Sequence, residues 1–376
     1  MPRKRLGGAK KWLFLVGMSL LIIVGLWSER SPILAWYYVF RLAGSDGDDR
    51  QVWATKVAAL GTGAIPRLLG CLESDDARAC RNACMAFKEI GGRWEPDDPQ
   101  RISFDDRVMR AFPHMSPAGK QAALSLQLSL LNPERPTPAT PQLPIGIRRI
   151  LVEAARVPDS AIRRQALLLA EALAGHTNNK DSESPFRELL EASLTDNEAE
   201  TRVEAIRVAS NPAINMLRSL GLSLRDANPE VRQAAILAVG PAPEAIATDD
   251  LLPLLHDPDT GVRRICEKAL RGRGLRDNHL RLARLITDVD PRKRLEVLEY
   301  VCIASDLEPG AWLRRMSHDP VPAVRAAAIR AAADDPHVDL SDRLDQLARN
   351  DPSSTVRQLA GYHLERRRSK ENRLQN

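Results

Sequence analysis

The sequence predicts an all-α fold: an α-solenoid of stacked antiparallel helix pairs, with a transmembrane helix near the N-terminus. The first observation behind this prediction is a short Asp-to-Arg motif that recurs every 30 to 32 residues in the second half of the chain. The second is composition, because 44% of the residues are hydrophobic, 27% are charged and only 4% are aromatic. That balance suits a folded helical protein and excludes a disordered chain. The third is an uncharged apolar run at residues 12–27.

The N-terminal segment, residues 1–31, has the pattern of a membrane anchor. Five basic residues precede the apolar run, which begins with Trp12 and ends with Trp27. As a helix the run would span about 24 Å, near the ~30 Å of a bilayer core. We expect an uncleaved signal anchor in a single-pass inner-membrane protein, with the N-terminus cytoplasmic and the bulk of the chain extracytoplasmic, hence periplasmic in a bacterium. Cleavage after Ser28 or Ala35, or a buried helix, remain alternatives.

Composition divides the rest of the chain into four parts. Residues 32–131 form a helical region that contains one full repeat. Residues 132–144 include five prolines and predict a stiff, extended linker. Residues 145–368 carry the regular repeats, and residues 369–376 form a polar tail. The linker is the expected boundary between two helical parts.

The repeat motif is an Asp followed six residues later by an Arg. Its six copies are Asp196 with Arg202, Asp226 with Arg232, Asp257 with Arg263, Asp288 with Arg294, Asp319 with Arg325, and Asp351 with Arg357. A fixed period of this size indicates stacked supersecondary units. A copy with a shortened turn surrounds Arg163, and a further early copy runs from Asp75 to Arg81.

Each unit has room for two helices joined by a polar turn. The motif Asp lies in that turn, where short polar side chains cap the second helix, and the Arg falls in the first turns of that helix. The residue before the Arg and the third residue after it are apolar or small in most copies, and in the early copy they are Cys80 and Cys84. These positions are one helical turn apart, so they form the stripe that packs against the first helix.

This pattern of Asp, Val-Arg and a small residue at about 31 residues resembles HEAT repeats, which are armadillo-like, and especially the short variety of phycobilin-lyase-type proteins. The resemblance covers about Ile145 to Arg367, and more weakly Ile33 to Ile90. It implies that the motif Asp and Arg residues form a polar ladder between neighbouring units. Lys293 departs from the pattern, because most copies have Val or another small residue there.

Cysteines and histidines are the candidate ligands for metal or redox chemistry. Cys71, Cys80 and Cys84 are best interpreted as buried free thiols, with a Cys71–Cys80 disulfide and a metal site as alternatives. None of the seven histidines forms a His-Glu pair like those of the HEAT-repeat hydroxylases that bind iron. The sequence also lacks Walker, GxSxG and GxGxxG motifs. We therefore expect no catalytic residue, no cofactor, no metal and no enzymatic activity.

The outward ridge of the second helices is the best candidate for a functional surface. Helical geometry places it at one, five and eight residues after each motif Arg, opposite the packing stripe. The candidate partner-binding residues are Arg164, Arg207, Arg264, Lys268, Arg271, Arg330 and Tyr362. Cations mixed with apolar side chains suit a protein partner with acidic and apolar groups. The alternative is a solvated helix face without a partner.

These observations predict a membrane-anchored HEAT-repeat scaffold or adaptor that mediates protein–protein interactions without catalysis, held in the membrane by residues 12–27. A cofactor-handling or lyase-like protein is the alternative that the repeat type suggests. Nucleic-acid binding is not expected, because the formal net charge of +5 equals the five basic residues before Trp12 and leaves the body neutral. The sequence shows no sign of a small-molecule substrate.

Overall fold

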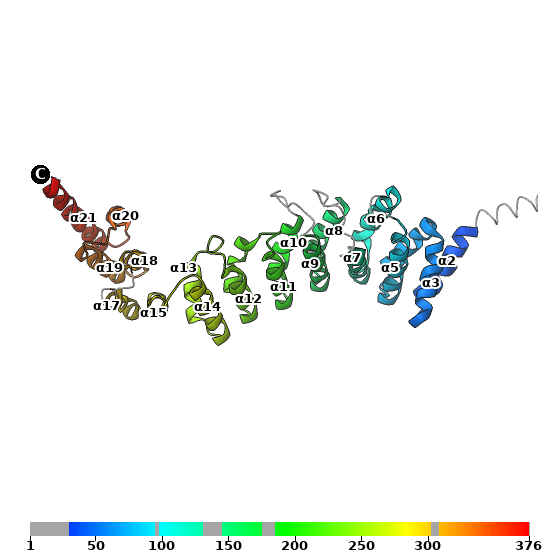
Figure 1. The fold of residues 1–376 in the computed structure, drawn as a ribbon, viewed down its shortest axis with the longest axis horizontal. Coiled ribbons are helices and arrows are strands. Elements are labelled where there is room, and N and C mark those ends of the chain that lie inside the picture. The colour runs from blue at the N-terminus through cyan, green and yellow to red at the C-terminus, as the bar shows by residue number, and fades with distance from the viewer. Residues whose placement is uncertain (1–29, 95–97, 131–144, 175–184, 302–307, 376) are drawn as a thin grey trace, which may run out of the picture. The chain divides into compact units, whose positions relative to one another are not determined.

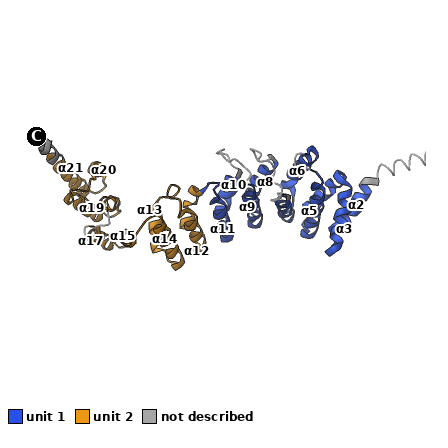
Figure 2. Cartoon of the chain, viewed as in Figure 1, with its two compact units in different colours: residues 1–216 blue, residues 217–376 orange. Residues whose placement is uncertain are grey.

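The computed structural model describes residues 30–94, 98–130, 145–174, 185–301 and 308–375 (Figure 1). Within these ranges the secondary structure is α-helix and 3₁₀-helix without any strand, so the predicted all-α class is confirmed. The chain divides into two compact units, Met1–Met216 and Leu217–Asn376 (Figure 2). The predicted proline-rich linker, residues 132–144, lies outside the described residues.

Unit 1 is a stack of helix pairs. Its elements are α2 (Arg30–Ala43), α3 (Gly47–Ala59), η1 (Gly61–Ala64), α4 (Ile65–Glu73), α5 (Ala77–Gly91), α6 (Pro99–Ala111), η2 (Phe112–His114), α7 (Pro117–Leu130), α8 (Ile145–Arg156), α9 (Ser160–Ala174), α10 (Pro185–Leu194) and α11 (Ala199–Ala209). Helices α3, α5, α7, α9 and α11 pack on one another in succession and form one layer, which we call the second layer. Helices α6, α8 and α10 stack beside it as the other layer.

Short polar side chains begin the second-layer helices of unit 1. Asp76 accepts hydrogen bonds from the main-chain N–H groups of Arg78 and Ala79 at the start of α5. Asp159 does the same for the first N–H groups of α9. Each cap satisfies donors that the helix itself leaves unpaired.

A close main-chain contact fixes the start of α7 against the end of α4. The N–H of Ser116 donates to the carbonyl of Leu72 at 3.1 Å, and the hydroxyl of Ser116 accepts from the N–H of Gly119 at 3.0 Å. A Cβ atom at position 119 would lie 1.9 Å from the Leu72 carbonyl oxygen. The approach of the two helices therefore requires glycine at this position.

Unit 2 continues the pairs with shorter and less regular first helices. Its elements are η3 (Leu217–Gly221), η4 (Ser223–Arg225), α12 (Pro229–Val239), α13 (Thr248–Leu251), η5 (Leu252–His256), α14 (Thr260–Gly272), α15 (Asp277–Ile286), α16 (Pro291–Leu295), α17 (Val297–Val301), α18 (Pro309–Met316), α19 (Pro322–Asp334), α20 (Ser341–Asn350) and α21 (Ser354–Gln375). Helix α12 packs on α14, and α19 packs on both α16 and α21. The core contains the residues that precede the motif arginines, among them Val231, Val262, Val324 and Val356.

Buried ion pairs join consecutive motifs. The bidentate pairs of unit 2 connect Nε and Nη2 of an arginine to the two carboxylate oxygens of the next motif at 2.6–2.9 Å, and they are Arg232 with Asp257, Arg294 with Asp319, and Arg325 with Asp351. In unit 1, Nε of Arg163 donates to Oδ2 of Asp196 at 2.5 Å. All eight side chains are nearly withdrawn from solvent.

Each motif arginine also closes its own turn. Its Nη1 donates to the carbonyl oxygen of the Asp six residues before it, at 2.6–2.8 Å, and the residues are Arg202, Arg232, Arg263, Arg294, Arg325 and Arg357. One guanidinium thus satisfies carbonyl groups of its own turn and, in the bidentate pairs, the carboxylate of the neighbouring repeat. This double use explains why arginine rather than lysine occupies the position.

The series of pairs is interrupted between two repeats of unit 2. Nζ of Lys293 donates to Oδ2 of Asp288 at 3.1 Å, within the same motif. In the described part of unit 2, Arg263 forms no ion pair with Asp288 and donates only to carbonyl groups of its own turn. The second helices α14 and α16 also do not pack closely on one another. At this point of unit 2 the Asp288 carboxylate is thus bound by the lysine of its own motif and not by the arginine of the preceding one.

The predicted single-pass membrane location, with a cytoplasmic N-terminus and an extracytoplasmic body, is contradicted. Among the residues that the structure describes, no helix is both long and apolar enough to cross a membrane. The described residues of α2 number 14, about 21 Å of helix, which is shorter than a span. Helix α21 has 22 residues but is rich in charge. The predicted span itself, residues 12–27, lies outside the described residues.

Candidate functional site

The second layer of unit 1 carries a groove made of two adjoining hollows. The first has a volume of about 380 Å³ and lies between α5 and α7. The second has a volume of about 520 Å³ and is lined by α7, α9 and α11. Gln121 and Ser125 of α7 line both hollows. We call this continuous surface the unit 1 groove.

The α5–α7 hollow has an apolar floor and a basic rim. Cys84 and Met85 of α5 face Leu126 of α7 across the floor. Arg81 and Lys88, both exposed, form the rim on α5. No acidic residue lines the hollow, and neither cation forms an ion pair with any residue that the structure describes. This half of the groove therefore presents two cations without an ion-pair partner beside apolar surface, with Asp76 as the acid that acts on Arg81.

The other half of the groove contains two arginines, and each of them pairs with two glutamates. Nη1 of Arg164 lies 2.6 Å from Oε2 of Glu200. Arg207 binds both Glu171 and Glu204, and these hydrogen bonds, with Glu204 contributing most, raise the pKa of Arg207 above its ordinary value. Carboxylates therefore outnumber guanidinium groups in this half, which has a net negative charge.

Helix starts show how α5 aligns with the later repeats. The fourth residue of α5 is Cys80, where α9 has Arg163, and the fifth is Arg81, where α9 has Arg164. The Cys80 thiol donates to the carbonyl of Ser74, six residues earlier, as the motif arginines do. The expected motif from Asp75 to Arg81 is thus displaced by one residue.

This displacement explains why the sequence analysis missed the basic rim. Arg81 occupies the position of Arg164, on the outward ridge, and does not occupy the ladder position. Aligning the repeats on the helix-capping residues Asp76 and Asp159, rather than on the arginines, places Arg81 on the ridge. Cys84 correspondingly lines the hollow and is only half-buried, whereas Ala79 and Ala83 take the packing positions.

The cysteines in the described ranges are free thiols: Cys71, Cys80, Cys84 and Cys266. Burial raises the pKa of Cys71 to about 11 and that of Cys84 to about 12. A thiol with such a pKa is protonated near neutral pH, so it is a poor nucleophile and metal ligand. No group of His, Cys, Asp and Glu side chains among the described residues could hold a metal ion.

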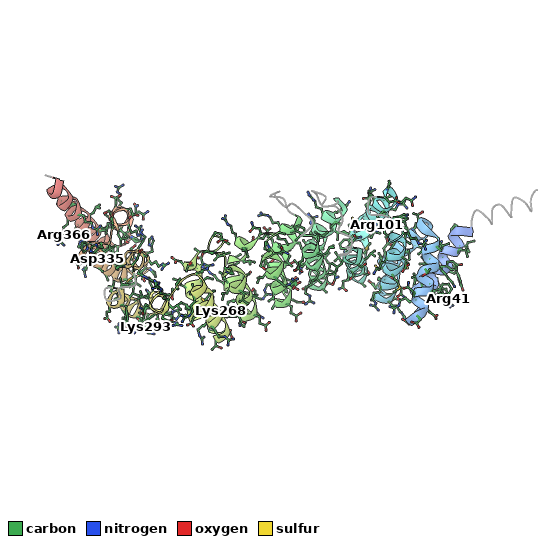
Figure 3. All side chains as sticks on the ribbon, viewed as in Figure 1. Arg41, Arg101, Lys268, Lys293, Asp335 and Arg366 are labelled. Atoms are coloured by element: carbon green, nitrogen blue, oxygen red, sulfur yellow. The ribbon has the colours of Figure 1, made fainter. Side chains whose placement is uncertain are left out.

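The predicted partner-binding residues fall into separate groups. Arg164 and Arg207 lie on α9 and α11 of unit 1, within or beside the groove, and are ion-paired. Arg264, Lys268 and Arg271 lie on α14 of unit 2 (Lys268 is labelled in Figure 3).

The three α14 cations are not equally available to a partner. Arg271 pairs with Asp277 at 2.7 Å. Arg264 and Lys268 are exposed and form no ion pair with another described residue. Two of the three therefore carry uncompensated charge.

Arg330 and Tyr362 lie on α19 and α21, which pack on each other. The Tyr362 side chain is 60% exposed, and its ring contacts that of His363 edge to face. The predicted residues thus lie on α9 and α11 in unit 1, and on α14, α19 and α21 in unit 2.

Comparisons with known proteins give only distant likenesses. No protein-family model matches the sequence, and no curated protein matches it. A crystal structure of importin beta is similar with a TM-score of 0.47 and 14% identity, over 88% of this chain and 53% of that one. The chain thus spans about half the length of that protein.

Two further structures resemble the chain more weakly. An engineered protein gives a TM-score of 0.32 at 17% identity, over 88% of this chain and 93% of that one. A structure of tumor overexpressed gene (TOG) domain arrays of microtubule polymerases, which concerns tubulin recruitment and assembly, gives 0.24 at 13% identity, over 84% of each chain. All three TM-scores are below 0.5, so the assignment of function rests on the groove and not on these likenesses.

Proposed function

We propose that this protein is a non-catalytic scaffold of HEAT-type repeats whose unit 1 groove binds a segment of a protein partner. The observation that carries the proposal is the combination of an apolar floor and unpaired cations in one hollow that is open to solvent. Interfaces between proteins combine an apolar centre with a polar rim. Binding requires complementary shape and charge only, so no residue needs a chemical role.

The packing of the second layer supports this proposal. The floor of the groove belongs to helices whose opposite faces lie in the core, where Ala83, Phe87 and Ile90 of α5 are buried. A surface held by such packing is largely formed before a partner arrives, which lowers the entropic cost of binding. The groove therefore suits selective binding of one partner segment, rather than binding that requires the surface to change shape.

A groove-filling substitution tests the proposal. Ser125 is exposed and lines both hollows, so Ser125→Trp fills the groove without entering the core. Glu191→Trp, at an exposed position of α10 in the other layer, is the matched control. With a labelling enzyme fused after Asn376, we expect specific labelled proteins in cells expressing the parent and the Glu191→Trp protein, and their loss with Ser125→Trp. Retention of the same proteins with Ser125→Trp, at unchanged helicity, would refute the groove as the binding site.

The α14 cations allow a second arm of the same experiment. The sequence predicts Arg264, Lys268 and Arg271 as partner-binding residues, so reversing their charge tests that alternative. If the groove is the binding site, this triple variant keeps its labelled proteins, because those cations lie on a helix of unit 2. If only the triple variant loses its labelled proteins, the binding site lies on α14 and not in the groove.

A further inference from the structure

The cations of the unit 1 groove that lack an ion-pair partner lie in its α5–α7 half. Arg81 and Lys88 lie seven residues apart on the same face of α5, which places them about 10.5 Å apart along the helix axis. Met85 lies between them, and its side chain is one of the apolar groups of the hollow. The order along the helix is thus cation, apolar group, cation.

Among the described residues, neither rim cation has an ion-pair partner, and the nearby acid is Asp76, whose pKa is lowered by main-chain hydrogen bonds and also by the charge of Arg81. The lining residues include no Asp or Glu. The acidic residues of the neighbouring hollow, Glu200 and Glu204, are already paired with Arg164 and Arg207. The apolar run at residues 12–27 contains no acid either, so it does not match the charge pattern. The residues that line the hollow therefore supply no carboxylate to bind Arg81 or Lys88.

We propose that the α5–α7 hollow binds an acidic amphipathic helix of a partner protein. The helix would carry two carboxylates seven residues apart, which contact Arg81 and Lys88, and a large apolar side chain midway between them, which contacts Met85 and Leu126. Seven residues of a helix advance by the same ~10.5 Å that separates the two cations, so one helix can contact both. This inference rests on the proposed function and specifies the chemistry of the partner segment.

The test uses a fluorescein-labelled synthetic four-turn peptide as the probe. The peptide has Glu at two positions seven apart, Leu at the third and fourth positions between them, and an Ala/Gln background. Two control peptides replace both Glu by Lys, or both Leu by Ser. Fluorescence anisotropy with the purified full-length chain gives the dissociation constants. We expect the acidic peptide to bind about tenfold more tightly than either control, and more weakly as salt rises.

Protein variants locate the binding. Arg81→Glu with Lys88→Glu reverses the rim, and Arg264→Glu with Lys268→Glu makes the same change of net charge on α14, where both cations are also exposed and unpaired. We expect the first double variant to weaken acidic-peptide binding by about tenfold or more, and the second by less than about twofold. If the reversal at α5 unfolds the chain, Arg81→Gln with Lys88→Gln replaces it.

Three results would overturn the inference: equal binding of the Glu and Lys peptides, equal loss with the two double variants, or no binding of any peptide. These failures differ from failure of the proposed function. If Ser125→Trp still abolishes partner labelling in cells, the groove remains the binding site and only the acidic helix is wrong. A fourth contrary result, binding of the basic peptide alone, would show that the hollow binds a basic segment and not an acidic one.

Discussion

At the scale of single residues, the motif arginine connects its own turn to the next repeat. In Arg294, for example, Nη1 donates to the carbonyl of Asp288 at 2.8 Å, while Nε and Nη2 hold the carboxylate of Asp319. The same carboxylate accepts from the N–H of Val321, in the turn that leads into the next helix. Removal of one partner would leave the other charge buried and without compensation.

Asp319→Ala is therefore expected to lower the free energy of unfolding by about 3–5 kcal/mol, because the Arg294 guanidinium, only 7% exposed, would lose its counter-ion. Urea unfolding followed by circular dichroism measures the change. Asp342→Ala is the control, since Asp342 pairs with Arg314 on the surface. Its loss should be small, because exposed pairs contribute little. Equal losses for the two variants would show that burial does not govern these pairs.

The buried carboxylates also predict how stability changes with pH. Burial acts to raise the pKa of Asp351, but hydrogen bonds from Arg325 and from the N–H of Ser353 outweigh it and hold the pKa below the ordinary 3.8. A carboxyl group with a lowered pKa in the folded state stabilises the fold fully above about pH 3.8. This contribution is lost as the pH falls from 3.8 through the folded-state pKa.

The contribution of Asp351 to the free energy of unfolding should thus be constant near neutral pH and should decline below about pH 3.8. Urea unfolding of the parent protein at a series of pH values measures this decline. Asp351→Asn should be less stable at neutral pH and should decline less steeply with acid. An identical acid decline in the parent and the variant would contradict the role assigned to this carboxylate.

At the scale of elements, close packing and the broken series of pairs are the features with measurable effects. The α4–α7 contact has no room for a side chain at Gly119, where a Cβ would lie 1.9 Å from a main-chain oxygen. Gly119→Ala should lower stability by about 1–3 kcal/mol, since the two helices must move apart. Gly70→Ala, where a Cβ meets no atom within 4 Å, is the control and should be neutral or stabilising. Thermal unfolding of both variants makes the comparison.

The interruption at Lys293 predicts a stabilising substitution. Lys293→Val would release Asp288 for Arg263 and would restore the residue type that is buried in other motifs, such as Val262 and Val324. We expect the melting temperature to rise by about 2 °C or more. Arg292→Val, at the neighbouring exposed position, removes the same charge without freeing Asp288 and should give no rise. A decrease for Lys293→Val would mean that the lysine pair stabilises this repeat.

At the scale of the whole molecule, the sequence predicted the repeat architecture because its signals are local and periodic. An Asp in a turn and an Arg at the fourth position of the following helix recur at a fixed spacing, and hydrogen bonds within one turn account for both. The predicted membrane location was wrong, because no helix among the described residues could span a bilayer. That prediction came from an apolar run with a basic cluster before it and a tryptophan at each end, a pattern that occurs once and does not recur like the repeat motif.

The candidate site was harder to predict than the fold. Recognising that Arg81 lies on the outward ridge requires the start of α5 at Ala77, which the spacing of arginines alone misplaces by one residue. The hollow also depends on α7, which has no motif Asp or Arg, and on the small side chains that α7 presents there, such as Ala118 and Ser125. Surface shape of this kind arises from the packing of two helices and leaves no periodic trace in the sequence.

Site-specific photo-crosslinking in cells tests the central claim, that the unit 1 groove binds a protein partner, most directly. A photoreactive amino acid replaces Ser129, which is exposed at the edge of the α5–α7 hollow, or Glu191, which is exposed in the other layer. We predict a discrete crosslinked protein from position 129 and none from position 191. Crosslinks from position 191 alone would place the partner on the opposite layer and would contradict the assignment of function to the groove.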